Sequence, residues 1–133
     1  MENFLAPYRP QLLSILRIIA GLMLMAHGTA KHLGYPVHAF NKVIWNSPSG
    51  YAGMIELVLG ALLVIGLFTR PVAFVLSGLC AVAFWGWHVI PRESIHPLVN
   101  GGELAALYAF VFIYICAAGP GPWSVDAAVR NKS

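Results

Sequence analysis

Apolar residues fill four long stretches of this chain, and most of the proline and charged residues lie outside these stretches. The stretches cover residues 12–33, 51–69, 71–90 and 102–118. A helix that crosses the hydrocarbon core of a membrane needs about 20 mostly apolar residues. The pattern therefore predicts four transmembrane helices in a single membrane domain over residues 1–133.

The segments between the stretches indicate how the helices are connected. Arg70 and Pro71 form a very short turn, so the second and third helices are expected to be antiparallel neighbours. Residues 34–50 are more polar, with apolar positions at near-helical spacing and the amphipathic rings of Tyr35 and Trp45. The predicted fold is an all-α integral membrane protein, an antiparallel four-transmembrane-helix bundle with a loop or short interfacial helix between the first and second spans.

Composition supports the membrane assignment and excludes other classes. Of the 133 residues, 59% are hydrophobic and 10% are charged, and the mean hydropathy is +0.73, which is more apolar than a soluble domain can bury. The net charge of +3 comes from scattered residues without a basic run. The expected partner is therefore the lipid bilayer and not nucleic acid. Cys80 and Cys116 lie in apolar runs and form no redox or metal-binding motif.

The first stretch has an alternative interpretation as a secretory signal peptide. In that case Arg9 would be its basic region and residues 18–26 its apolar core. Arg17 lies against this core, and no convincing small-residue cleavage site follows. A transmembrane helix is the preferred interpretation.

Basic residues near the helix ends indicate the orientation in the membrane. An even number of spans places both termini on one side, and the basic residues on that side outnumber those on the other by four to two. The four are Arg9, Arg70, Arg130 and Lys132, and the two are Lys42 and Arg92. The positive-inside rule then predicts that both termini are cytoplasmic.

Polar side chains gather at one depth of the predicted bundle, near the extracytoplasmic ends of all four helices. They are His27, Lys31, Glu56, His88, Asn100 and Glu103. Asn100 and Glu103 also have the positions expected for a cap that opens the fourth helix. Ionisable groups are costly inside a membrane unless they pair or line a cavity. These six residues are therefore predicted to surround a polar pocket in the outer leaflet.

Spacing of three or four residues places polar and small side chains on one face of each helix. The predicted inward faces are Arg17, Gly21, Leu24, Gly28 and Lys31 in the first helix, Gly53, Glu56, Gly60 and Leu63 in the second, Ser77, Ala81, Phe84 and His88 in the third, and Glu103, Ala106 or Leu107, Phe110 and Tyr114 in the fourth. Glycine at such positions lets two helices approach closely. Trp85 and Trp87, near the end of the third helix, are interpreted as interfacial anchors.

Arg17 lies at the opposite end of the first helix, about 21 Å from Lys31 along the helix axis. Two interpretations are open. The side chain can reach the lipid headgroups, or it can face inward as an ion-pair or phosphate contact, with Thr69 and Arg70 as neighbours. Arg17, Thr69 and Arg70 therefore form a secondary candidate site on the inner side.

Several short motifs, in their order and spacing, resemble the DoxX-like family of small membrane proteins. They are Leu16-Arg17, His27-Gly28 with Lys31, Ile55-Glu56-Leu57, Leu67-Phe68-Thr69-Arg70, His88 and Asn100-Gly101-Gly102-Glu103. The resemblance covers about residues 12–122. It implies a four-helix protein of the bacterial-type inner membrane, in a family tied to thiosulfate and quinone redox chemistry and to membrane complexes that handle oxidative stress. It implies no catalytic residue and leaves open whether the protein is an enzyme.

Three functions are compatible with these residues. The first is a redox-associated subunit whose pocket binds a quinone or a similar amphipathic molecule, with hydrogen bonds from His27 and His88 and proton relay by Glu56 or Glu103. The second is a metal- or haem-binding protein that uses the same four side chains, although Lys31 would repel a cation. The third is a non-catalytic scaffold or chaperone, in which Lys31 and Glu56 are a structural ion pair. Other membrane subunits or further copies of the chain are the expected protein partners.

Overall fold

Residues 3–36 and 43–130 are described by the structure, a computed structural model. In these ranges the backbone forms helices joined by turns, and they contain no strand. The helices are η1 (Ala6–Tyr8), α1 (Arg9–Leu33), α2 (Pro48–Ile65), α3 (Thr69–Ala83), η2 (Phe84–Val89), α4 (Ile90–Arg92), α5 (Pro97–Asn100), α6 (Glu103–Ala118) and α7 (Val125–Arg130). Because α3, η2 and α4 follow one another without a break, residues 69–92 form one continuous helix.

Three helical segments in the described ranges are long and apolar enough to cross a membrane. They are Ala6–Leu33, Pro48–Ile65 and Thr69–Arg92. The fourth predicted span, α6, is apolar, but its 16 residues rise only about 24 Å, against a hydrocarbon core of about 30 Å. The all-α fold is confirmed for the described residues, and three of the four predicted spans have the length and apolar composition of membrane helices.

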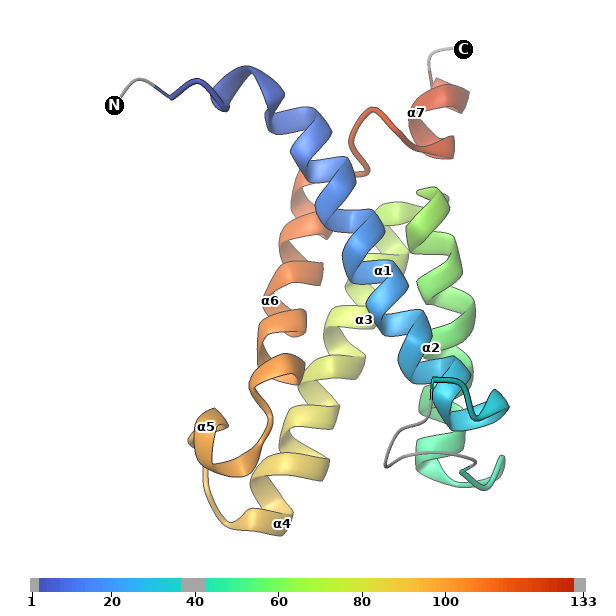
Figure 1. Cartoon of the computed structure of the whole chain (residues 1–133), viewed down its shortest axis with the longest axis vertical. Coiled ribbons are helices and arrows are strands. Elements are labelled where there is room, and N and C mark those ends of the chain that lie inside the picture. Colours follow the sequence, from blue (N-terminus) through green and yellow to red (C-terminus); the bar gives the residue numbers. More distant parts are fainter. Residues whose placement is uncertain (1–2, 37–42, 131–133) are drawn as a thin grey trace.

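The long helices pack as two hairpins (Figure 1). α1 packs along α2, and α3 packs along α6. Glycines bring α1 and α2 together, since a Cβ atom on Gly28 would lie 2.7 Å from the carbonyl oxygen of Gly53. Similarly, a Cβ atom on Gly21 would lie 3.1 Å from the carbonyl oxygen of Gly60. These contacts leave no room for larger side chains, so the first hairpin is closely packed.

The two hairpins meet in an apolar core and then diverge. The core contains Ala20 and Leu24 from α1, Leu63 from α2, Val72, Ala73, Leu76 and Cys80 from α3, and Tyr108, Phe112 and Ile115 from α6. The described chain begins and finishes at one end of the molecule, with η1 and α7, and we call this the termini end (Figure 1). The hairpins separate toward the opposite end, which carries α4 and α5, and we call this the pocket end.

The predicted inward faces are correct for the first hairpin. Every predicted residue of α1, from Arg17 to Lys31, is buried, as is every predicted residue of α2, from Gly53 to Leu63. Polar and small residues mark these two faces clearly, because the other sides of both helices carry large apolar side chains that are exposed. Sequence spacing was sufficient to orient this hairpin.

The predicted inward face is wrong for α6 and only partly correct for α3. In α6 the buried side chains are Tyr108, Phe112 and Ile115, whereas Phe110 and Tyr114 are 75% and 58% exposed. In α3 the most buried face contains Thr69, Val72, Ala73, Leu76 and Cys80. The four predicted positions from Ser77 to His88 are half-buried, and Ser77 donates a hydrogen bond to the carbonyl oxygen of Ala109 in α6. The lipid-facing side of a membrane helix is itself apolar. In a helix such as α6, which is apolar on nearly every side, the spacing of apolar residues therefore does not show which side faces the protein interior.

The predicted interfacial helix between the first two spans falls partly on residues 37–42, which lie outside the described residues. Val43 to Ser47, which are described, form turns and no helix. Trp45 packs against His32 with ring centroids 4.0 Å apart, and the Nε2 atom of His32 lies 2.8 Å from the carbonyl oxygen of Gly50. These contacts attach the segment to the end of α1 and the beginning of α2.

Candidate functional site

Lys31 of α1 and Glu56 of α2 form an ion pair at the pocket end. The Nζ atom of Lys31 donates hydrogen bonds to both carboxylate oxygens of Glu56, at 2.9 and 2.8 Å. The two side chains are only 11% and 12% exposed. Gly53 makes room for the pair, since a Cβ atom there would lie 3.0 Å from the Cδ atom of Lys31. The close glycine packing of the hairpin therefore positions both charges and removes most of their contact with solvent.

The third helix changes geometry as it reaches the pocket end. Residues 84–89 form the π-helical segment η2, which contains Trp87 and His88. The wider turn of a π-helix shifts the faces of the helix relative to regular 3.6-residue spacing, and such segments often occur at functional sites. The guanidinium group of Arg92 donates a hydrogen bond to the carbonyl oxygen of Trp87 at 2.9 Å. This bond gives the distorted backbone a hydrogen-bond partner.

His88 is held by the connection that leads into α6. Its Nδ1 atom lies 3.2 Å from the carbonyl oxygen of Asn100. The side chain of Asn100 is fully buried, donates to the carbonyl oxygen of Ser94 at 2.9 Å and accepts from the backbone N–H of Gly102 at 2.7 Å. Asn100 therefore fixes the shape of this connection and, through its carbonyl group, the position of His88.

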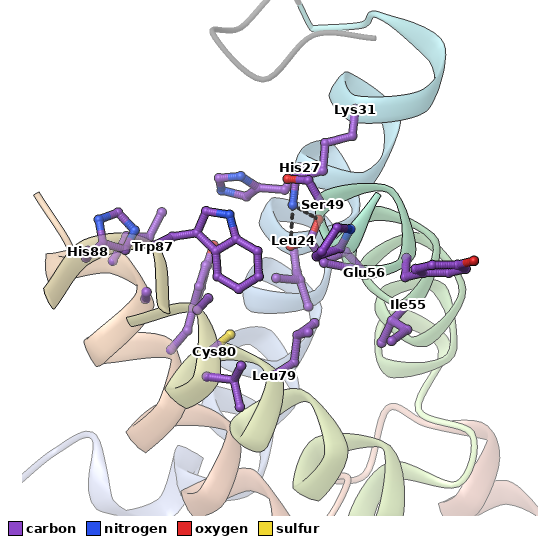
Figure 2. A pocket seen from close by; sticks show the side chains of 18 of the residues that line it. Leu24, His27, Lys31, Ser49, Ile55, Glu56, Leu79, Cys80, Trp87 and His88 are labelled. Atoms are coloured by element: carbon purple, nitrogen blue, oxygen red, sulfur yellow. Dashed lines mark hydrogen bonds and ion pairs between the residues drawn. The ribbon is translucent and has the colours of Figure 1, made fainter. Parts of the chain in front are cut away.

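A cavity of about 640 Å³ lies between the diverging hairpins. Figure 2 shows Glu56 and the Lys31 ion pair on one side of it, Trp87 and Cys80 on the other, and His27 between Lys31 and Trp87. Apolar side chains from α1, α2, α3 and α6 form most of its wall, including Leu24, Ile55, Leu79, Val82 and Leu104. The cavity thus combines an extensive apolar surface with a few polar groups, a combination typical of small-molecule sites.

The structure brings four of the six predicted pocket residues to this cavity. His27, Lys31, Glu56 and His88 line it. Asn100 and Glu103 are not among the lining residues, because Asn100 is buried in the connection before α6 and Glu103 is exposed at the beginning of that helix. Glu103 was assigned to the pocket because it lies on the face of α6 that was predicted to point inward, and that face is exposed.

Sequence reasoning missed several residues that line the cavity. The sequence indicates a membrane anchor for Trp87 and a loop position for Arg92, and it gives Cys80 and Tyr108 no role in a pocket, yet all four line the cavity. Cys80 and Trp87 lie on the face of the third helix that continues from Leu76, so a correct face for this helix would have found them. Tyr108 offered a weaker signal, as one of two tyrosines in an otherwise apolar helix.

Comparison with known proteins gives the family. A family model described as DoxX matches residues 12–89. This chain belongs to the DoxX family. It is 41% identical over 133 residues to an uncharacterized protein of Haemophilus influenzae (strain Rd), with 98% of this chain and 99% of the relative covered. No solved structure matches the chain. The matched residues extend from α1 to the end of η2, so they include His27, Lys31, Glu56 and His88.

In this DoxX-family protein, the described residues offer little to a metal ion. They contain no group of three or more histidine, cysteine, aspartate or glutamate side chains that could hold one. Lys31 also takes both oxygens of Glu56, which a metal would need as ligands. The geometry of the described pocket therefore gives no support to the hypothesis of a metal centre built on His27, Glu56, His88 and Glu103.

Arg17 forms the centre of the termini end of this DoxX-family protein. Its side chain is fully buried, so it does not reach the lipid headgroups. Its nitrogens donate to four backbone carbonyl groups, those of Leu63, Val64, Pro120 and Trp123. Gly66, with a φ of +72°, provides the space, since a Cβ atom there would lie 2.8 Å from the Nη1 atom of Arg17. Arg17 thus joins the end of α2 to the segment that follows α6.

Thr69 and Arg70 belong to the same structural cluster. Arg70 donates from Nη1 to the carbonyl oxygens of Cys116 and Ala117, in the last turn of α6. The backbone N–H groups of Phe68 and Thr69 donate to the two carboxylate oxygens of Asp126, at 2.9 and 2.8 Å. These contacts satisfy helix-terminal groups that the helices themselves leave unpaired. In the secondary candidate site, Arg17 and Arg70 are therefore bonded to backbone carbonyl groups of the protein, and Thr69 takes part through its backbone N–H group.

Asp126 has a perturbed pKa for reasons that the contacts explain. Burial by itself raises the pKa of this carboxyl group, but the hydrogen bonds from Thr69 and Phe68 and the charge of Arg130 act in the opposite direction. Their sum lowers the pKa of Asp126 below its ordinary value of 3.8. The group is therefore ionised at neutral pH and binds the N-terminus of α3 as a carboxylate.

Proposed function

We propose that this protein is a redox-associated membrane subunit that binds a quinone, or a similar amphipathic small molecule, in the cavity at the pocket end. The observation that carries the proposal is the cavity itself, which has about 640 Å³ of space, mostly apolar walls and a few polar side chains. A quinone needs an apolar channel for its tail and hydrogen-bonding groups for its head.

Particular side chains suit each part of such a ligand. Leu24, Ile55 and Leu79 offer apolar contacts for an isoprenoid or alkyl tail. His27 and His88 offer ring nitrogens near the carbonyl oxygens of the head, and Glu56 is a group through which a proton can pass. Trp87 presents an aromatic ring against which a planar head can stack. The protein would present the bound quinone to a partner protein in the same membrane.

The proposal includes a four-span topology in a bacterial-type inner membrane, with both termini in the cytoplasm. α6 packs along the full-length helix of residues 69–92, which supports its crossing the membrane despite its 16 residues. The termini end carries Arg9 at the beginning of α1, Arg70 in the first turn of α3 and Arg130 at the end of α7, as the positive-inside rule requires of a cytoplasmic face. A green fluorescent protein fused to the C-terminus should fluoresce, and an alkaline phosphatase fused there should be inactive. The opposite pair of results would reject this topology.

Tryptophan fluorescence tests the binding proposal directly. Purified protein in lipid nanodiscs should show saturable quenching when a short-chain ubiquinone analogue is added. The variant Trp87→Phe should lose a large part of this quenching, because it removes the indole in the cavity wall. Trp85→Phe is the matched control, since Trp85 is 51% exposed and does not line the cavity. Quenching that rises linearly without saturation, or is the same in both variants, would contradict binding in this cavity.

A non-catalytic scaffold is the second candidate, because one observation favours it. Lys31 donates hydrogen bonds to both carboxylate oxygens of Glu56, so the two charges neutralise each other and can serve a purely structural role. In that case the pair fixes the first hairpin, and the exposed apolar surface of α6 contacts another subunit or a second copy of the chain. The scaffold predicts that partners captured from the membrane are retained in the variant His27→Ala/His88→Ala. A quinone-binding subunit predicts that its quinone-dependent activity is lost in this variant.

A further inference from the structure

One buried polar group of the cavity has no partner within the described part of the protein. Tyr108 of α6 lines the cavity and is only 6% exposed. Its hydroxyl oxygen is buried, and no hydrogen-bond partner for it is found among the described residues. The ring of Tyr108 stacks on that of Phe112, with centroids 5.2 Å apart and an angle of 19° between the planes. Because Phe112 is fully buried, the stack fixes the ring of Tyr108 in the cavity wall.

The two buried charged groups of the cavity, unlike the hydroxyl group of Tyr108, have hydrogen-bond partners among the described residues. Lys31 and Glu56 are bonded to each other through both carboxylate oxygens. They belong to α1 and α2, whereas Tyr108 belongs to α6. The cavity is therefore lined by a charged pair from the first hairpin and, from the second, by Tyr108, whose buried hydroxyl group is unsatisfied within the described ranges.

A buried hydroxyl group without a partner is unfavourable compared with the phenyl ring of phenylalanine, which would fill the same space. Such a group is expected where its partner is a molecule other than the protein. The hydroxyl of tyrosine can donate one hydrogen bond and accept another. A carbonyl oxygen of a ligand that enters the cavity would satisfy it as an acceptor.

We propose that Tyr108 is the residue that recognises the head of the ligand, donating a hydrogen bond from its hydroxyl group to a carbonyl oxygen. A second oxygen on the far side of the same head faces the Lys31–Glu56 pair. The ligand class is thus a planar ring with oxygens at opposite positions, of which a 1,4-quinone is the simplest example. This inference rests on the proposed function and adds that the head connects the two hairpins.

The variant Tyr108→Phe tests this assignment. We expect the dissociation constant for the short-chain ubiquinone analogue to rise about tenfold, which corresponds to about 1.4 kcal/mol. The melting temperature of the ligand-free protein should stay the same or rise, because the change removes only the unsatisfied hydroxyl group. Tyr114→Phe is the matched control, since Tyr114 lies on the same helix and is 58% exposed. It should change neither quantity.

A second probe tests whether the protein binds both oxygens of the head, one at Tyr108 and one at the Lys31–Glu56 pair. An alkylphenol with the same tail has one ring oxygen and should bind the natural protein about tenfold more weakly than the quinone. In Tyr108→Phe this preference for the quinone should disappear. Equal binding of both probes to the natural protein would show that the second oxygen of the head is not recognised.

The possible failures are distinguishable. If the natural protein binds no quinone, the proposed function fails, and the assignment of Tyr108 fails with it. If the natural protein binds quinone and Tyr108→Phe binds it equally well, only the assignment of Tyr108 fails. A marked fall in the melting temperature of ligand-free Tyr108→Phe would also overturn the assignment, because it would show that the hydroxyl group has a partner inside the protein.

Discussion

The two ends of the molecule use polar side chains in opposite ways. At the termini end Arg17, Arg70 and Asp126 are bonded to backbone groups at helix ends. At the pocket end Lys31 and Glu56 are bonded to each other beside a cavity. A charge bonded to backbone has a fixed partner in every folded molecule. A charge bonded to a side chain can exchange that partner when a ligand enters.

This difference separates what holds the fold together from what is available for binding. The hairpins are joined at the termini end, where Arg17 connects the end of α2 to the segment after α6. They diverge at the pocket end, where the cavity lies between them (Figure 1). Substitutions at the termini end should therefore reduce stability without a direct effect on binding, whereas substitutions at the pocket end should also alter binding.

The largest expected effect tests the termini end. Arg17→Met should reduce the free energy of unfolding by about 4 kcal/mol, because several hydrogen bonds from a charged group are lost and their buried acceptors remain without partners. Arg17→Lys should recover only part of this loss, since one ammonium group cannot reach all four carbonyl groups. Reversible unfolding in mixed detergent micelles measures the difference.

The control for Arg17 is an arginine of the same helix that is exposed. Arg9 begins α1 at the surface, so Arg9→Met should change the free energy of unfolding by less than about 0.5 kcal/mol. If Arg17→Met were as stable as Arg9→Met, the termini end would not be the structural centre, and the contrast between the two ends would be lost.

The next effect tests the ion pair of the pocket end. Glu56→Gln leaves Lys31 charged, buried and without its counterion, which should reduce the free energy of unfolding by about 3 kcal/mol. The double variant Lys31→Met/Glu56→Met should recover most of this loss, because a well-packed apolar pair often replaces a buried ion pair without cost.

Binding then distinguishes the roles of the pair. The double variant should fold, but it should bind the ubiquinone analogue about tenfold more weakly, since it lacks the polar wall of the cavity. Unchanged binding by the stable double variant would show that Lys31 and Glu56 serve the fold alone, as the scaffold hypothesis requires.

The sequence predicted the first hairpin better than the second for a physical reason. In α1 and α2 the inward face carries glycines, Arg17, Lys31 and Glu56. The charged side chains would be costly to expose to lipid, and glycine has no side chain to contact it, so the spacing of these residues locates the protein interior. In α6 both faces are apolar, and only packing against α3 decides which side is buried. In the third helix the polar residues marked the face of Ser77 and His88, whereas Cys80 and Trp87 lie on the neighbouring face that continues from Leu76.

The candidate site follows the same division. The Lys31–Glu56 contact could be expected, because both residues lie on the inward faces of helices that meet through glycine. Tyr108 could not, because its role depends on which face of α6 turns inward. Arg17 was recognised as unusual, but the chain segment after α6, which supplies two of its carbonyl acceptors, gave no sequence signal of that contact.

A smaller effect depends on pH and concerns Asp126. Asp126→Asn should reduce the free energy of unfolding by about 1 kcal/mol at pH 7, as for other lost helix caps. Because the pKa of Asp126 is lower in the folded protein, its contribution is complete above the pKa of the unfolded chain and is lost as pH falls through the folded value. The difference between the natural protein and the variant should therefore shrink below about pH 4. A difference that is constant from pH 7 to pH 3 would contradict the role of the carboxylate.

The smallest effect concerns Glu103, a carboxylate of the pocket end that does not line the cavity. Glu103→Gln should change both the free energy of unfolding and the binding of the ubiquinone analogue by less than about 0.5 kcal/mol, because the side chain is exposed at the beginning of α6. Glu56→Gln, which alters the same chemical group inside the cavity, is its natural comparison. If Glu103→Gln weakened binding as much as Glu56→Gln, proximity to the pocket end would matter more than access to the cavity. The distinction between groups that line the cavity and groups that merely surround it would then have to be abandoned.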